Sequence, residues 1–265
     1  MHSKDITIII PSKNRSNNLI KLANYYLSAG FQGDILMLDA SEKQETINLQ
    51  NSLSKFKNIR VLHTPVDYFI AVSRSLDHIK TKYVACTGDD DFLFIKGLID
   101  CKYFLEKEQS FGGVSGLGIL GVYDNDRDVI SKFSIYHIEK YIDQKKGDRL
   151  KKIINTYSVL NFCLHRSSLF KKAFIEYPDE IHPSNYELFN SFLFVLNEKI
   201  GKISSFYILR LSHKFNKKFP EAISYYNEDF LNFFKQKILS QLSEDFKIKK
   251  KNKNLLNKLK EHHKK

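Results

Sequence analysis

Three consecutive carboxylates, Asp89, Asp90 and Asp91, are the residues of this chain whose type and spacing most clearly indicate chemistry. They follow a short apolar run at 83–87. Because adjacent anions repel one another, a cation is expected where they meet. Mg²⁺ or Mn²⁺ binds through one or two carboxylates and completes its shell with phosphate oxygens and water. The segment therefore predicts a divalent metal held against a nucleotide diphosphate.

The elements that position these carboxylates are predicted by four apolar runs, the first of them β-branched, that alternate with helical patterns. Strands are expected at 6–10, 34–38, 60–63 and 83–87, and helices at about 19–27, 43–56, 70–79 and 95–108. Pro11 is expected to end the first strand. Strands that alternate with helices indicate a parallel, doubly wound sheet, which binds ligands at the carboxyl ends of its strands.

The second half of the chain has a different pattern. The glycine-rich run 112–118 and the apolar run 119–123 indicate a strand, and no Gly-Lys-Ser/Thr follows to make a phosphate loop. Residues 124–156 are expected to be loop and helix, 158–165 and 206–211 strand, and 184–196 helix. We expect residues 1–110 and 111–222 to be two halves of one domain, followed by a lysine-rich helical extension at 223–265.

Three segments resemble motifs of family 2-type glycosyltransferases: the opening strand with Pro11-Ser12-Lys13-Asn14-Arg15, Leu38-Asp39-Ala40-Ser41, and the DXD-like Gly88-Asp89-Asp90-Asp91. The resemblance implies a GT-A fold, a Rossmann-like and mostly parallel sheet flanked by helices. It implies transfer of a sugar from a nucleotide-diphosphate donor to a hydroxyl of a surface glycan or lipid-linked acceptor. The second motif lacks the usual second acid and glycine, which indicates a divergent bacterial branch.

By this resemblance, Pro11, Ser12 and Arg15 line the nucleotide pocket, and Arg15 meets a phosphate. Asp39 accepts hydrogen bonds from the base or ribose, or else caps the helix that follows it. Arg74, on the helix expected at 70–79, faces the nucleotide or lies on the surface.

Asp89 and Asp91 have DXD spacing and are expected to point the same way from an extended backbone. One would contact the ribose or the metal and the other would ligate Mn²⁺ or Mg²⁺, with Asp90 able to take either role after a shift of one residue. His213, which follows a strand, is the third expected ligand. The alternative for the three acids is a helix N-cap cluster.

Glu187 is the candidate catalytic base for an inverting transfer, in which a carboxylate removes the proton of the acceptor hydroxyl. Family members usually carry an acidic pair before a helix, whereas Tyr186-Glu187-Leu188 offers one acid. Asp179 and His182 are rivals for the role. The alternative for Glu187 is a solvated acid at a helix start.

Composition limits the class of protein and its partners. The 265 residues carry a formal charge of +12, but nine lysines and one acid at 246–265 supply +8 of it, which leaves 12 − 8 = +4 for the rest. Three cysteines without CxxC spacing indicate a reducing cytosol. Because no apolar run is long enough to span a bilayer, we expect a cytoplasmic protein, with the basic tail either resting on the anionic inner face of the plasma membrane or simply solvated.

Other classes of function stay open. A nucleotidyltransferase acting on a sugar phosphate also uses carboxylates and a metal, but residues 11–15 lack its usual glycine-rich loop. A non-catalytic protein that binds an anionic surface through the basic tail is a second alternative, although no nucleic-acid partner is expected. A polymerase palm, which can carry Gly-Asp-Asp, fits neither the chain length nor the strand–helix order.

Overall fold

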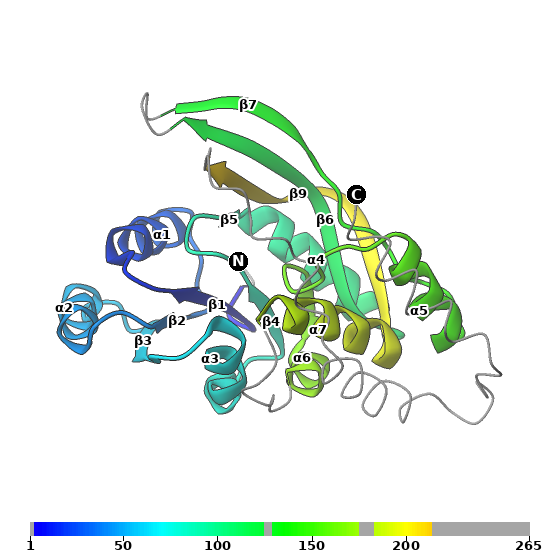
Figure 1. Ribbon diagram of the computed structural model, residues 1–265, viewed down its shortest axis with the longest axis horizontal. Helices are drawn as coiled ribbons and strands as arrows, with labels where there is room; N and C mark the ends of the chain where they lie inside the picture. The colour runs from blue at the N-terminus through cyan, green and yellow to red at the C-terminus, as the bar shows by residue number, and fades with distance from the viewer. Residues whose placement is uncertain (1–2, 125–128, 175–182, 214–265) are drawn as a thin grey trace.

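The computed structural model describes residues 3–124, 129–174 and 183–213 (Figure 1). These residues form a nine-stranded sheet with the order β3-β2-β1-β4-β8-β6-β9-β5, and β7 pairs with β6 beside this path. The helices are α1 (Ser16–Ser28), α2 (Lys43–Leu53), α3 (Tyr68–Arg74), α4 (Ile95–Lys107), α5 (Lys146–Asn155), α6 (Ser167–Ala173) and α7 (Pro183–Asn197). The extension expected at 223–265 lies outside the described residues.

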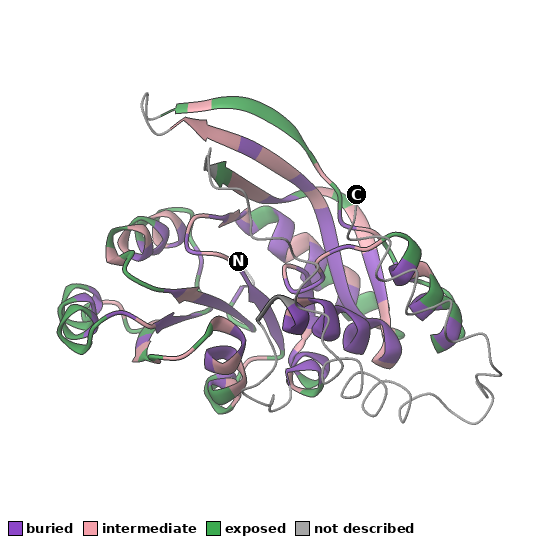
Figure 2. Ribbon diagram, viewed as in Figure 1, coloured by how far each residue is buried: buried purple, intermediate pink, exposed green. Residues whose placement is uncertain are grey.

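The first half is the parallel, doubly wound sheet that the sequence predicts. β1 (Ile6–Ser12) pairs in parallel with β2 (Asp34–Asp39) and with β4 (Tyr83–Cys86), and β2 pairs in parallel with β3 (Ile59–His63). Every residue of β4 is buried, and so is nearly all of β1 (Figure 2). Burial on both faces explains why these strands are continuous apolar runs instead of alternating ones.

The prediction that Pro11 ends the first strand is wrong. β1 continues to Ser12, and Pro11 lies opposite Leu38 of β2. Bonding groups alternate along β1: the carbonyl of Ile9 accepts from Thr87 on the β4 side, and that of Ser12 accepts from Ala40 on the β2 side. At position 11 a backbone N–H would therefore face β4. Because the pairing of β1 with β4 has already ended at Ile9, the N–H that proline lacks costs the sheet no hydrogen bond there.

The second half joins the same sheet in a mixed orientation. β8 (Leu164–Arg166) pairs antiparallel with β4 and with β6 (Phe111–Asp124). β6 runs parallel to β9 (Lys199–His213), which also pairs antiparallel with the short β5 (Phe92–Leu93). β9 therefore brings the end of the described chain back beside the segment that follows β4.

Two element predictions in the second half of the chain are wrong. Part of the segment 124–156, expected as loop and helix, forms β7 (Val129–Tyr136), an exposed strand paired antiparallel with β6, whereas the helical part is present as α5. The strand expected at 158–165 is reduced to β8, because the residues before it make a turn. In both cases the sequence pattern alone did not reveal the partner that decides the conformation. The helix expected at 70–79 is present as α3, which continues in a single 3₁₀ turn at Leu76–His78.

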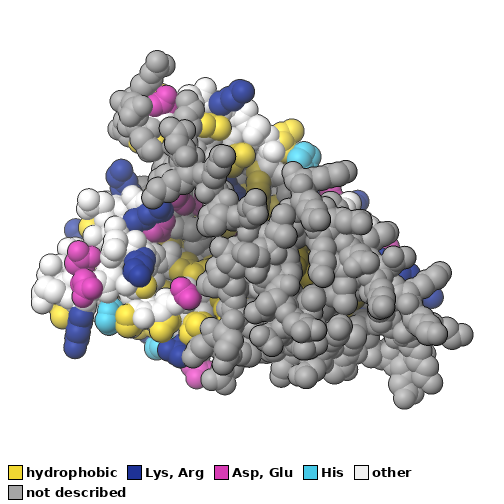
Figure 3. Space-filling model, viewed as in Figure 1, with side chains coloured by type: hydrophobic (Ala, Val, Ile, Leu, Met, Phe, Trp, Pro, Cys, Tyr) yellow, Lys and Arg dark blue, Asp and Glu magenta, His cyan; other side chains and the backbone are white. Residues whose placement is uncertain are grey.

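The surface adds two observations on charge and membranes. On the described part of the face in Figure 3, lysine and arginine side chains lie interspersed with aspartate and glutamate side chains. Within the described ranges, no helix is both long and apolar enough to cross a bilayer.

Candidate functional site

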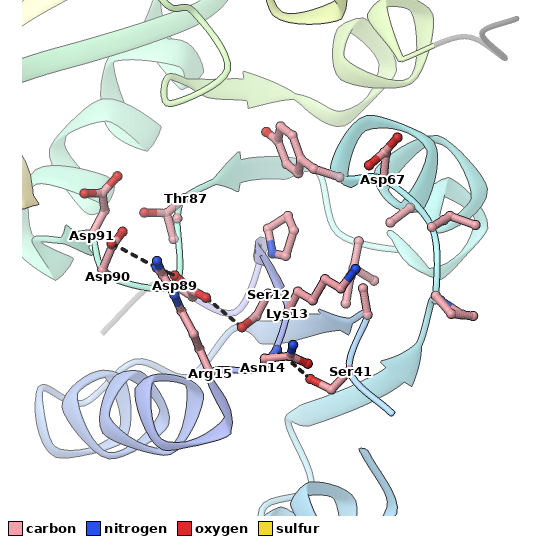
Figure 4. Close-up of a pocket in the computed structure, with 18 of the residues that line it drawn as sticks. Ser12, Lys13, Asn14, Arg15, Ser41, Asp67, Thr87, Asp89, Asp90 and Asp91 are labelled. Atoms are coloured by element: carbon pink, nitrogen blue, oxygen red, sulfur yellow. Dashed lines mark hydrogen bonds and ion pairs between the residues drawn. The ribbon is translucent and has the colours of Figure 1, made fainter. Parts of the chain in front are cut away.

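A cavity of about 1270 Å³ opens at the carboxyl ends of the parallel strands (Figure 4). Its lining includes the segment after β1 (residues 11–15), the segment after β4 (residues 87–91), and two residues from the second half, Glu187 of α7 and Arg210 of β9. This is the edge of the sheet at which the strand order predicts a ligand.

The strand-end cluster, defined here as Ser12, Arg15 and Asp89, joins the ends of β1 and β4. The Ser12 hydroxyl donates to Oδ2 of Asp89 over 2.7 Å, and Nη1 of Arg15 donates to Oδ1 over 2.9 Å. Nη1 also donates to Asp90 over 3.2 Å. Asp89 raises the pKa of the Arg15 guanidinium. Because both contacts use one nitrogen of a half-exposed side chain, Arg15 has further N–H groups that can meet a phosphate.

Asn14 ties this cluster to the neighbouring strand. Its φ of 56° lies in the left-handed region, which few residues other than glycine adopt. Its backbone N–H donates to the hydroxyl of Ser41, just beyond β2, over 2.8 Å (Figure 4). The loop after β1 is thus fixed from both sides, and backbone and hydroxyl groups line the wall between the two strand ends.

The expectation that Asp89 and Asp91 point the same way is wrong. Asp89 and Asp90 lie in a turn, in which the N–H of Asp91 bonds to the carbonyl of Gly88 over 3.4 Å. The turn sends Asp89 toward the strand-end cluster and Asp91 toward β9. Spacing predicts a shared direction only in an extended backbone, and three adjacent acids after a glycine form a tight turn here.

Asp91 belongs to a second group, the Arg210 cluster, defined as Asp91, Arg210, Tyr136 and Phe162. Nε of Arg210 and the backbone N–H of Leu211 donate to the two oxygens of Asp91 over 3.1 and 3.0 Å. The Arg210 guanidinium carbon lies 4.9 Å from the ring centroid of Tyr136 and 4.4 Å from that of Phe162. This aromatic contact holds a cation at the cavity wall.

The two charges of this cluster are largely removed from water. Burial raises the pKa of the Asp91 carboxyl, although Arg210 and the Leu211 amide oppose the shift. Burial also opposes the charge on Arg210, but Asp91 and Tyr136 hold the pKa of Arg210 above its usual value. A cation in such a setting interacts more strongly with an anionic ligand than an exposed one does.

Glu187 lines the same cavity from α7, and the predicted helix at 184–196 is present as Pro183–Asn197. The Tyr157 hydroxyl donates to its Oε1 over 3.0 Å. Burial raises the pKa of the Glu187 carboxyl, while Tyr157 and Arg210 act in the opposite direction. A carboxyl group with a raised pKa, oriented by one hydrogen bond, is suited to accept a proton near neutral pH. Its assignment as the base stays a prediction.

Asp39 and Arg74 are not among the described residues that line the cavity. Both Asp39 oxygens are bonded within the protein: Oδ1 accepts from the N–H and hydroxyl of Ser41, and Oδ2 accepts from the hydroxyl of Thr46 in α2. Arg74 is exposed at the end of α3. The surface position of Arg74 matches its alternative. Asp39 does not cap α2, because that helix begins after Glu42 and Asp39 bonds the N–H of Ser41 and two hydroxyl groups instead. A nucleotide contact by either residue stays a prediction.

The described residues do not assemble the predicted metal site by themselves. No group of three or more histidine, cysteine, aspartate or glutamate side chains is placed to hold a metal within the described ranges. Asp89 and Asp91 are separated by the turn, and each is bonded to its own arginine. His213 ends β9, but its side chain lies outside the described residues, as do Asp179 and His182.

Two residues on the cavity wall were missed from the sequence. Thr87 ends the apolar run before the three acids, and its place next to that motif is a signal that could have found it. Asn161, in a turn before β8, has no such signal, because the pairing of β8 with β4 brings it to the site. The second half of the chain thus contributes polar groups that no local motif marks.

No protein-family model matches this chain, and no curated protein matches its sequence. Its structure is similar to the crystal structure of S. aureus TarS residues 1–349, with a TM-score of 0.61 at 15% identity, covering 96% of this chain and 80% of that one. The fold is GT-A-like.

Two further crystal structures of the same TarS fragment match over nearly all of this chain. The complex with UDP-GlcNAc has a TM-score of 0.61 at 14% identity, covering 98% of this chain and 82% of TarS 1–349. The complex with UDP has a TM-score of 0.55 at 17% identity, covering 96% and 80% respectively. At such low identity the likeness establishes the arrangement of elements, and the function rests on the site.

Proposed function

We propose that this protein is a glycosyltransferase that moves a sugar from a nucleotide-diphosphate donor to an acceptor hydroxyl. The observation that carries the proposal is one cavity at the strand ends of a GT-A-like fold. It combines a half-exposed Arg15, an Arg210 whose side chain is 30% exposed, and a partly buried carboxyl group, Glu187. Two cations suit a diphosphate, and a carboxyl group with a raised pKa suits proton removal.

We take the donor to be a UDP-sugar. The TarS structures that share this fold contain UDP-GlcNAc in one case and UDP in another, which supports a nucleotide sugar as the ligand class. In this chain, the base and ribose would lie toward the ends of β2 and β3, where Ser41, His63 and Tyr68 line the cavity. The diphosphate would then lie over the strand-end cluster, within reach of Arg15.

The proposed reaction is a single displacement. The acceptor oxygen forms a bond to the anomeric carbon, the bond from that carbon to the diphosphate oxygen breaks, and the electron pair leaves with UDP. Glu187 takes the proton of the acceptor hydroxyl, and Arg15 and Arg210 stabilise the negative charge that develops on the leaving diphosphate. A surface glycan or lipid-linked molecule stays our predicted acceptor, and contact of the basic tail with an anionic membrane stays a prediction.

The test measures binding and product release. Calorimetric titration of the purified chain with UDP, UDP-GlcNAc and GDP, with and without Mn²⁺, is expected to show binding of the uridine nucleotides. Incubation with UDP-GlcNAc is expected to release UDP slowly, by transfer to water or to added acceptor. Absence of uridine-nucleotide binding in both metal conditions would contradict the proposal, and release of pyrophosphate from UTP and a sugar phosphate would favour a nucleotidyltransferase.

A further inference from the structure

Two polar side-chain atoms on the cavity wall have no hydrogen-bond partner in the described part of the protein. They are Oγ1 of Thr87 and Oδ1 of Asn161. Thr87 is 1% exposed and Asn161 is 2% exposed, and both residues line the cavity. Because a buried polar atom without a partner lowers stability, each such atom in a folded protein calls for an explanation. One such explanation is a bound ligand that supplies the missing hydrogen bonds.

The two residues lie beside neighbouring strands of the sheet: Thr87 follows β4, and Asn161 precedes β8. β4 and β8 pair antiparallel, with Val84 opposite His165 and Ala85 opposite Leu164. Thr87 directly follows the last residue of β4, and Asn161 lies three residues before β8, in the turn that leads into this antiparallel pair. Figure 4 shows Thr87 at the end of β4, next to the three acids. The two unpartnered atoms therefore belong to one part of the cavity wall.

The Asn161 turn is held in place by the protein itself. The N–H of Cys163 bonds to the carbonyl of Leu160 over 3.0 Å, and Nε2 of the buried His165 contacts the same carbonyl at 2.8 Å. The His165 ring stacks on Phe194 of α7, with ring centroids 3.9 Å apart. Asn161 is therefore presented by a fixed turn, as expected for a group that recognises a ligand by direction.

The strand order locates this part of the wall relative to the diphosphate. β4 and β8 lie between β1, which carries Ser12 and Arg15 at its end, and β9, which carries Arg210. A nucleotide sugar with its diphosphate over the strand-end cluster, and with its anomeric carbon toward Glu187, would place its sugar ring at the β4–β8 junction.

We infer that Thr87 and Asn161 recognise the sugar ring of the donor through hydrogen bonds to its hydroxyl or amide substituents. A sugar hydroxyl both donates and accepts, so it satisfies the Asn161 carboxamide in either orientation as well as the Thr87 hydroxyl. The Phe162 ring, on the same wall, offers an apolar surface to the ring's C–H groups. This inference rests on the proposed function and adds the two residues that select the sugar.

The experiment compares the binding of UDP with that of UDP-GlcNAc in four variants. Thr87→Val and Asn161→Leu remove the proposed contacts. Asn190→Leu is the matched control, because Asn190 is also fully buried and its carboxamide atoms lack partners among the described residues, but it does not line the cavity. Thr87→Ser keeps the hydroxyl and is the conservative rescue. Dissociation constants come from calorimetry at fixed Mn²⁺ concentration, and melting temperatures from thermal denaturation.

Thr87→Val and Asn161→Leu are each expected to raise the dissociation constant for UDP-GlcNAc about fivefold to a hundredfold, and to change that for UDP less than about twofold. Thr87→Ser and Asn190→Leu are expected to keep the wild-type preference for the sugar nucleotide. Because the two atoms lack partners in the free protein, the melting temperatures of Thr87→Val and Asn161→Leu should equal or exceed that of the wild type.

Five outcomes are decisive. Selective loss of UDP-GlcNAc affinity supports the inference. Equal weakening of UDP and UDP-GlcNAc overturns it, because the residues would then serve the diphosphate or a metal. Variants that do not fold also overturn it, because the atoms would then have partners within the protein. An unchanged preference in Thr87→Val and Asn161→Leu, with a wild type that binds both nucleotides, overturns the inference and leaves the proposed function standing. If the wild-type protein binds neither nucleotide, the proposed function itself fails.

Discussion

Asp39 and Glu187 are carboxyl groups in two regions of the molecule, and they differ in how many hydrogen bonds their oxygens accept. At the end of β2, Asp39 is fully buried, and its two oxygens accept three hydrogen bonds, from Ser41 and Thr46. On α7, Glu187 lines the cavity and accepts a hydrogen bond from Tyr157, and burial raises its pKa.

This difference in hydrogen bonding is a criterion for telling a structural carboxyl group from a reactive one. A carboxylate with both oxygens bonded to donors stabilises the fold and has little capacity left for a ligand. A carboxyl group that is desolvated and bonded on one side is costly to ionise, which is the state expected of a proton acceptor. By this criterion Asp39 belongs to the scaffold, and Glu187 is the carboxyl group to test for reactivity.

The largest expected effect is on turnover in Glu187→Gln. If Glu187 removes the acceptor proton, the substitution should lower the transfer rate by about 10² to 10⁴. UDP affinity should stay close to that of the wild type, because Arg15 and the strand-end cluster are untouched. Initial rates of UDP release with acceptor present, together with calorimetry, measure both quantities.

Tyr157→Phe is the matched control for this substitution, because it removes the orienting hydroxyl and keeps the carboxyl group. A smaller rate loss than in Glu187→Gln is expected. Wild-type turnover in Glu187→Gln would remove Glu187 as the base and return the role to a residue outside the described ranges, such as Asp179 or His182.

The next effect concerns Asp91, which faces Arg210 across the cavity wall. If UDP binds together with Mn²⁺, a UDP concentration of 100 times the dissociation constant should stabilise the wild type by about 2.7 kcal/mol. The stabilisation should be lost with EDTA and in Asp91→Asn, but kept in Asp34→Asn, an exposed residue at the start of β2. Equal stabilisation of wild type and Asp91→Asn at saturating Mn²⁺ would contradict a metal-binding role for Asp91.

Asp39→Asn tests the scaffold side of the comparison. The amide presents N–H donors where Ser41 or Thr46 also donates, so at least one buried bond is lost. We expect the free energy of unfolding to fall by about 1 to 3 kcal/mol, measured by urea denaturation. UDP affinity of the folded protein should change little if Asp39 is structural. A large loss of UDP affinity with unchanged stability would restore the predicted contact with the base or ribose.

The stability of the wild type and of Glu187→Gln, measured across a pH series, tests the raised pKa of Glu187. Because burial raises the pKa of Glu187 in the folded state, protonation favours folding, and the ionised form lowers stability above that pKa. Glu187→Gln should therefore be more stable than the wild type at neutral pH. The difference should shrink as pH falls through the folded pKa and vanish below about pH 4, near the unfolded value. A constant difference across this range would contradict the raised pKa.

The smallest effect is expected at the surface. Lys96 and Asp100 form an i,i+4 ion pair on α4 with an N–O distance of 2.6 Å, but Lys96 is 84% exposed. Lys96→Ala should change the free energy of unfolding by less than about 0.5 kcal/mol, because water and salt screen the pair. A larger loss in the free energy of unfolding, measured by urea denaturation, would show that this exposed ion pair stabilises the fold more than screening allows.

The sequence by itself determined the parallel core and the position of the ligand edge. Continuous apolar runs such as 6–10 and 35–38 are typical of strands buried between helices, and the carboxyl ends of such parallel strands meet at one edge. The presence of Arg15 and Asp89 at that edge followed from the residues that end the first and fourth strands. Ser12 and Glu187 were candidates through the family resemblance, and the structure places both at the cavity.

Only the tertiary structure decided what those residues touch. The direction of Asp91 depends on β9, which lies more than a hundred residues further along the chain. Asn161 reaches the cavity through the pairing of β8 with β4, and β7 became a strand because β6 was beside it. Such long-range pairs leave no periodic trace in a single sequence, because each partner is set by the packing of the whole sheet and not by its neighbours in the chain.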